Sequence, residues 1–133
     1  MLIRPSLFLR RALLADGVVT GACALLMVTG GAFLAGLLGL PEPLLFYAGL
    51  GLVPYALIVG YLGTRESLPR GAVWAVIACN LLWALDCVAL LAFGGMSPTW
   101  LGEAFVVVQI LTVLVFAELQ YMGLRRANAL AAA

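Results

Sequence analysis

Four long apolar stretches constrain the fold of this chain more than any other feature of its sequence. They run approximately over Leu13–Leu38, Leu44–Tyr61, Val73–Phe93 and Leu101–Gly123. A helix that crosses the roughly 30 Å hydrocarbon layer of a bilayer needs about 20 apolar residues, and each stretch is close to that length. The composition agrees, since 65% of the 133 residues are apolar and the mean hydropathy is +1.18. The sequence therefore predicts an all-α integral membrane protein.

The arginines predict how these helices are oriented. Basic residues near membrane helices stay on the cytoplasmic side. The connections 39–43 and 94–100 contain no basic residue. All seven basic residues lie before the first stretch, between the second and third, or after the fourth, at Arg4, Arg10, Arg11, Arg65, Arg70, Arg125 and Arg126. We therefore expect both termini in the cytoplasm. Because the connections are short, an antiparallel four-helix transmembrane bundle (N-in/C-in) is predicted, with residues 1–133 as a single domain.

The residue types that most metal and redox sites need are scarce. The chain has no histidine, and its three cysteines, Cys23, Cys79 and Cys87, lie inside predicted spans without a CxxC pair. This excludes histidine-ligated haem and the common zinc sites, and it disfavours a thiol relay. We therefore predict no catalytic and no metal-ligating residues, and the sequence names no cofactor.

Small residues recur at helical spacing and predict where the helices pack. Association in lipid depends on close backbone approach and on interhelical hydrogen bonds. On the third span, Asp86 shares the face of two of these small residues, and on the fourth a similar face contains Gln109, Thr112 and Gln120. The predicted packing positions are Gly17, Gly21, Gly49, Ala56, Gly60, Ala75 and Cys79.

Asp86 is the acid expected deepest in the membrane. It lies 16 residues after Arg70, which is about 24 Å along a helix, in the outer half of the span and away from every arginine. Gln109 reaches a similar depth, and Asn80 lies near the midplane. These three residues are expected either to form hydrogen bonds between helices, worth about 0.6–2 kcal/mol each, or to include a carboxylate at Asp86 that binds a proton or a cation.

Two further acids are expected near the cytoplasmic surface. Asp16 follows Arg11 by five residues and Glu118 precedes Arg125 by seven, distances of about 8 and 10 Å along a helix. The sequence predicts interfacial charge pairs with the arginines at both positions. The alternative is a point where a proton or cation enters.

The sequence favours a small non-catalytic membrane protein, an accessory or assembly subunit of a membrane complex or a homo-oligomer. Gln109 and Glu118 lie on opposite sides of the fourth helix, so one of them faces lipid or a partner. The alternative is a small proton- or cation-coupled transporter or channel that uses Asp86. A membrane enzyme ranks last, because an acid without histidine, lysine or a positioned nucleophile offers little for acid–base chemistry.

Two resemblances add to this interpretation. Four-helix multidrug exporters are similar in length and number of spans, but their membrane-embedded glutamate lies in the middle of the first helix, whereas here only Asp16 is found, near the predicted cytoplasmic end. The chain also resembles small four-span proteins of bacterial inner membranes, an uncharacterised family that implies no activity. That resemblance rests on Leu-Gly-Leu-Pro at 38–41, Pro-Arg-Gly-Ala-Val-Trp-Ala-Val-Ile-Ala at 69–78, Leu-Gly-Glu-Ala-Phe at 101–105 and Ala-Glu-Leu-Gln-Tyr at 117–121. The expected location is the bacterial inner membrane, and the expected partners are the lipid bilayer and other membrane subunits or a second copy, with no nucleic acid.

Overall fold

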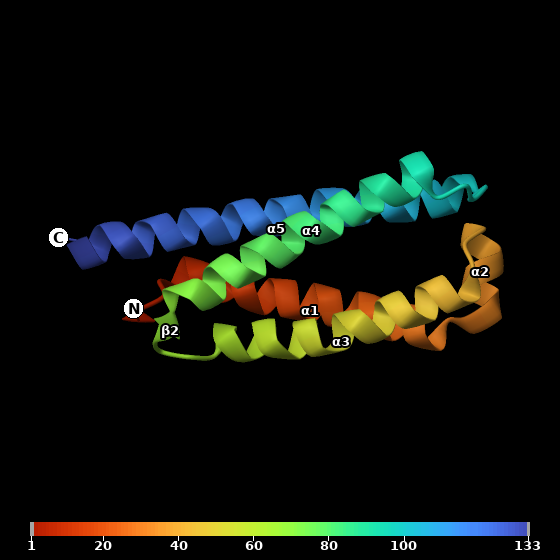
Figure 1. Ribbon diagram of the computed structural model, residues 1–133. Coiled ribbons are helices and arrows are strands. Elements are labelled where there is room, and N and C mark those ends of the chain that lie inside the picture. Colours follow the sequence, from red (N-terminus) through yellow and green to blue (C-terminus); the bar gives the residue numbers. More distant parts are fainter. Residues whose placement is uncertain (1, 133) are drawn as a thin grey trace.

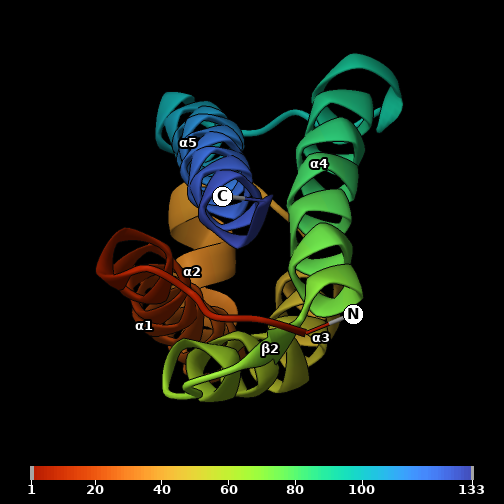
Figure 2. The ribbon, with the colours of Figure 1, turned by 90° about the vertical axis from the view of Figure 1, so that its left-hand side faces the viewer.

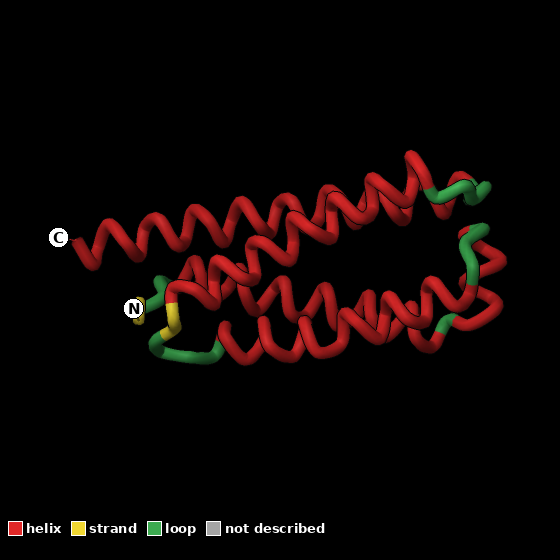
Figure 3. The backbone as a smooth tube through the Cα atoms, viewed as in Figure 1, coloured by secondary structure: helices red, strands yellow, loops and turns green. Residues whose placement is uncertain are grey.

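The computed structural model describes the backbone of residues 2–132 and the side chains of residues 2–127. Within this part the regular secondary structure is helical apart from one short antiparallel ladder, in which β1 (Leu2–Ile3) pairs with β2 (Leu68–Pro69) (Figure 3). The five helices are α1 (Leu7–Thr29), α2 (Gly31–Leu38), α3 (Glu42–Gly63), α4 (Arg70–Phe93) and α5 (Trp100–Ala132). Four of them, α1, α3, α4 and α5, are long and apolar enough to cross a membrane. The all-α prediction and the number of membrane-length helices are confirmed.

The first predicted span is wrong at both ends. The helix starts at Leu7 because the Ser6 hydroxyl caps it, accepting a hydrogen bond from the Leu9 amide at 3.2 Å. It ends at Thr29 because Gly31 has a φ of +56°, a conformation that glycine adopts without strain, and the chain then turns into the separate helix α2. Counted from Leu7, Asp16 is the tenth of the 23 residues of α1. It is therefore close to the middle of that helix and not near its end.

The long helices form two antiparallel pairs. The helix α1 packs most extensively against α3, α4 packs against α5, and the contact between α1 and α5 joins the pairs. Figures 1 and 2 show the two pairs as two layers, with both chain termini at one end and α2 at the other. There α2 contacts α3 and α5. The layers leave room between them for side chains from all four long helices.

Small residues allow α1 and α3 to approach closely. A Cβ atom added to Gly17 would lie 3.0 Å from the Gly60 Cα atom, and one added to Gly49 would lie 2.9 Å from the Met27 Cβ atom. A Cβ on Gly21 would lie 3.7 Å from the Ala56 Cβ atom. The predicted packing residues Gly17 and Gly21 therefore meet Gly60 and Ala56 across this interface, and Gly49 meets Met27.

The predicted packing face of the third span points outward. Ala75, Cys79 and Asp86 are all exposed on α4. The buried residues of this helix are Val73, Val76, Ile77, Asn80, Ala84 and Cys87. Asn80 turns toward polar partners on the other helices. The side chains that share its face are buried with it, whereas Ala75, Cys79 and Asp86 lie on other sides of the helix.

The end of α2 fixes the start of α5. Gly39 ends α2 with a φ of +67°, and the Thr99 amide donates a hydrogen bond to the Leu38 carbonyl at 3.0 Å. The Thr99 hydroxyl donates to the Leu37 carbonyl at 2.8 Å. These contacts join the two layers at the end opposite the chain termini.

Candidate functional site

A polar cluster joins all four membrane-length helices around one carboxylate. Asp16 is fully buried, with an exposed fraction of 0%, as is Gln120, and Asn80 is 2% exposed. The remaining members are Thr20, one turn after Asp16 on α1, and the half-buried Tyr55 on α3. We call these five residues the Asp16 cluster.

The hydrogen bonds of the Asp16 cluster converge on its carboxylate. The Thr20 hydroxyl donates to Asp16 Oδ1 at 2.9 Å. The other oxygen, Oδ2, accepts from Tyr55 at 2.9 Å, from Asn80 at 3.1 Å and from Gln120 at 2.7 Å. Around it, the Tyr55 oxygen lies 3.0 Å from Asn80 Oδ1, and the Asn80 amide donates to Gln120 Oε1 at 3.0 Å. Each long helix therefore contributes at least one side chain to a single network.

The predicted pairing of Asp16 with arginine is wrong. All four of its donors are uncharged side chains, and the arginines make other contacts. Arg10 donates to the Gly63 carbonyl at 3.4 Å, and the Arg125 guanidinium lies 5.8 Å from the centre of the Tyr121 ring. The physical reason is that α1 begins at Leu7 and not at Leu13 as predicted, which places Asp16 near the middle of the helix. Glu118 is exposed on α5.

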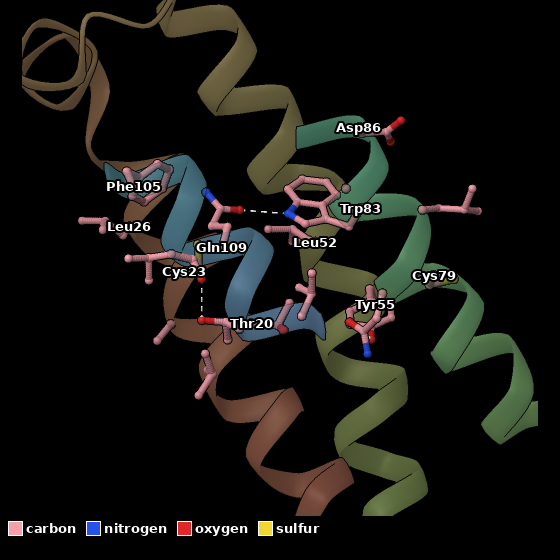
Figure 4. A pocket seen from close by; sticks show the side chains of 18 residues that line it. Thr20, Cys23, Leu26, Leu52, Tyr55, Cys79, Trp83, Asp86, Phe105 and Gln109 are labelled. Atoms are coloured by element: carbon pink, nitrogen blue, oxygen red, sulfur yellow. Dashed lines mark hydrogen bonds between the residues drawn. The ribbon is translucent and has the colours of Figure 1, made fainter. Parts of the chain in front are cut away.

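A cavity of about 600 Å³ lies between the two helix pairs beside the Asp16 cluster (Figure 4). Its walls are mainly apolar. Val19, Leu82 and Val108 line it and are also exposed, so the cavity reaches the outer surface of the helices. The full lining is Val19, Thr20, Ala22, Cys23, Leu26, Gly51, Leu52, Tyr55, Cys79, Asn80, Leu82, Trp83, Asp86, Phe105, Val108, Gln109, Thr112 and Val113. We call it the central cavity.

Two sets of polar side chains that line the central cavity take part in side-chain hydrogen bonds. Thr20, Tyr55 and Asn80 line it and also bind Asp16. In the second set, the Trp83 indole donates to Gln109 Oε1 at 2.9 Å (Figure 4). Anything bound in the cavity therefore lies next to the groups that hold the buried carboxylate.

Asp86 lies at the edge of the central cavity and points away from the Trp83–Gln109 pair (Figure 4). It also lines a smaller neighbouring hollow of about 220 Å³, together with the same Trp83 and Gln109. Its side chain is exposed. The expectation that Asp86 forms hydrogen bonds across a helix interface of this chain is thus corrected. Asn80 and Gln109 do form such bonds, within the Asp16 cluster and with Trp83, and Asp86 does not join them.

Asp16, Asn80 and Gln109 are candidate residues from the sequence. The sequence did not predict that Asp16 and Asn80 belong to one cluster while Gln109 accepts a hydrogen bond from Trp83. Thr20 could have been found from its spacing of four residues after Asp16, which puts both on one helix face. Gln120 shared a predicted packed face with Gln109. Tyr55 lies six residues before Tyr61, the predicted end of the second span, and this depth is the signal that could have separated it from a membrane-interface tyrosine.

Within the residues that the structure describes, no group of three or more histidine, cysteine, aspartate or glutamate side chains could hold a metal ion. Comparison of the chain with protein-family models, with curated proteins and with solved structures found no match. The site's own geometry is therefore the basis for assigning a function.

Proposed function

We propose that the chain is an antiparallel four-helix transmembrane bundle of a bacterial inner membrane, with both termini in the cytoplasm. The two antiparallel helix pairs support this arrangement, and both termini lie at the same end of the molecule (Figure 1). The connection between α3 and α4, which contains Arg65, lies at that end as well. The positive charges thus gather at one end, as expected for the cytoplasmic side.

Within this bundle, we propose that the protein is non-catalytic and binds a membrane-soluble amphipathic molecule in the central cavity. The observation that carries the proposal is the cavity itself: about 600 Å³, mainly apolar, with polar groups at Thr20, Tyr55 and Asn80. Small-molecule sites usually measure about 300–1,000 Å³ and combine apolar walls with a few placed polar groups. Because exposed lining residues bring the cavity to the outer helix surface, a ligand can enter from the bilayer.

The cavity-filling variant Gly51→Phe tests this binding. Gly51 lines the central cavity, and a Cβ atom there meets nothing within 4 Å. The phenyl ring is expected to occupy the cavity and to lower ligand affinity at least tenfold, since it removes the volume that the ligand needs. The measurement is the amount of amphipathic molecule that copurifies with the protein from native membranes, determined by mass spectrometry.

Gly60→Phe is the matched control. Gly60 is on the same helix, and a Cβ there also meets nothing within 4 Å, but the residue does not line the central cavity. This variant should retain the wild-type amount of ligand. Equal ligand content in Gly51→Phe and Gly60→Phe would contradict the proposal.

A second function, an accessory subunit or a homo-oligomer, is favoured by Asp86. This acid is exposed on a membrane-length helix, where a carboxylate facing hydrocarbon costs about 2.5–3.5 kcal/mol. A polar group from a partner subunit or a second copy would cover it and remove that cost. Because Asp86 lies at the edge of the central cavity, such a partner would contact the protein beside the cavity ligand.

Solubilisation in a mild detergent tests the accessory function. Wild-type protein is expected to migrate with a partner or a second copy, and Asp86→Ala should lose that association while it stays folded. Glu118→Ala, which removes an exposed carboxylate from α5, should keep it. A wild-type protein that migrates alone from native membranes would count against an accessory or oligomeric role.

A further inference from the structure

The Asp16 cluster contains one more hydrogen-bonding contact than its own hydrogens can fill when the carboxylate is ionised. The six contacts described above join Asp16, Thr20, Tyr55, Asn80 and Gln120. A hydroxyl supplies one hydrogen and an amide supplies two. The Thr20 hydroxyl and the two amides fill four of the contacts. The other two both involve the Tyr55 oxygen, which has a single hydrogen for Asp16 Oδ2 and Asn80 Oδ1.

One added proton on Asp16 Oδ2 fills the remaining contact. The protonated carboxyl then donates to the Tyr55 oxygen, and Tyr55 donates its own hydrogen to Asn80 Oδ1. Oδ2 still accepts from the Asn80 and Gln120 amides, so all six contacts carry a hydrogen. The added proton also removes the charge of a fully buried carboxylate whose hydrogen-bond donors are all uncharged.

The groups that face Asp16 offer no other neutralising charge. Thr20 faces it from its own helix, Tyr55 from α3, Asn80 from α4 and Gln120 from α5, and Tyr55 alone among them is titratable. The other titratable side chains at the central cavity are Cys23, Cys79 and Asp86, none of which donates a hydrogen bond to Asp16 in the described network. A proton is the simplest positive charge that this site can take.

We propose that the Asp16 cluster binds one proton, and that this proton competes with a hydrogen-bond-donating ligand in the central cavity. When the proton leaves Asp16, the charged carboxylate is the stronger acceptor and takes the Tyr55 hydrogen. Asn80 Oδ1 then lacks a donor. Because Tyr55 and Asn80 both line the cavity, the hydroxyl of an amphipathic ligand can donate to that oxygen.

The exchange is balanced as an ionic step without any redox change. The Asp16 carboxyl O–H bond breaks, its electron pair stays on the carboxylate, and one proton is released for each ligand bound. The ligand keeps its own hydroxyl hydrogen and only shares it with Asn80. The proton site does not depend on the proposed function, whereas the competition rests on it.

Infrared spectroscopy in a detergent without ester groups tests the proton site. As the pH is lowered, the wild-type protein should gain a carboxylic-acid C=O band that is absent in Asp16→Asn. Asp86→Asn, the same substitution at the exposed acid, should keep the band. Tyr55→Phe should keep it at a higher frequency, because the acid loses its acceptor, and this variant reports on the site even where Asp16→Asn does not fold. Absence of the band in wild type, or a band unmoved by Tyr55→Phe, would overturn the proton site.

Ligand affinity as a function of pH tests the competition, with dodecanol and its methyl ether as probes. The alcohol should bind about tenfold more tightly at high pH than at low pH, because a ligand that displaces a proton is favoured when protons are scarce, and coupling between two sites is typically about 5–150-fold. The ether, which has no donor, should show no such gain. In Asp16→Asn the alcohol should bind independently of pH. Equal pH dependence for alcohol and ether would overturn the competition, and failure of both probes to bind would remove the proposed function while the infrared result stands.

Discussion

Replacement of Asp16 with leucine is expected to lower the free energy of unfolding by about 3–5 kcal/mol, since several buried donors lose their acceptor at once and each costs about 1–3 kcal/mol. The donors left without it are on Thr20, Asn80 and Gln120, whereas the Tyr55 hydroxyl keeps Asn80 Oδ1 as an acceptor. The network also holds all four membrane-length helices together, so the effect should extend over the whole molecule. Reversible unfolding in mixed detergent micelles measures it.

Two controls separate this effect from a general intolerance of substitution. Asp16→Asn is uncharged and can still accept from Tyr55, Asn80 and Gln120 through its amide oxygen, so it should cost less than about 1 kcal/mol. Asp86→Leu changes an exposed acid and should not destabilise the protein. A loss in Asp86→Leu as large as that in Asp16→Leu would contradict the central place of the Asp16 cluster.

Replacement of Gly17 with leucine is expected to separate α1 from α3 and to cost about 3 kcal/mol. An added Cβ atom would lie 3.0 Å from both the Cα and the nitrogen of Gly60, and 3.2 Å from the Ala56 carbonyl oxygen. These are backbone atoms, which cannot turn aside as a flexible side chain can. Overpacking of this kind typically costs about 1–3 kcal/mol, occasionally more. Measurement of unfolding, together with cross-linking between cysteines introduced in the two helices, checks it.

Gly60, which faces Gly17 across the same contact, provides the control substitution. A Cβ atom on Gly60 meets nothing within 4 Å, so Gly60→Leu should be neutral or should gain up to about 1 kcal/mol from the better helix propensity of leucine. If Gly17→Leu and Gly60→Leu have the same effect, the helices do not cross as the structure has them.

The number of membrane-length helices could be predicted because it depends only on hydropathy and length. The start of α1 could not be predicted in this way. Arg10 and Arg11 lie inside the helix, but an apolar stretch read from hydropathy begins only after them. The break at Gly30 and Gly31 was hidden because both flanking segments are apolar. This single shift of the helix changed the meaning of Asp16, from an interfacial acid to the buried centre of a network.

The spacing of residues along the sequence also could not predict which face of a helix points inward. Helical spacing shows that Ala75, Cys79 and Asp86 share one side of α4, but not whether that side is buried. Asn80 decides it, because a buried amide needs partners and finds them on Asp16 and Gln120. Such long-range pairings join residues 64 and 40 positions apart, and no local pattern contains them.

The cavity beside the Asp16 cluster is proposed to bind an amphipathic molecule from the membrane. The most direct measurement is a high-resolution structure of the protein solubilised from its native membranes without removal of lipid. Elongated density is expected in the central cavity, with a polar end within hydrogen-bonding distance of Tyr55 and Asn80. A cavity closed by movement of α3 and α4, or filled by a helix of a second copy, would contradict it.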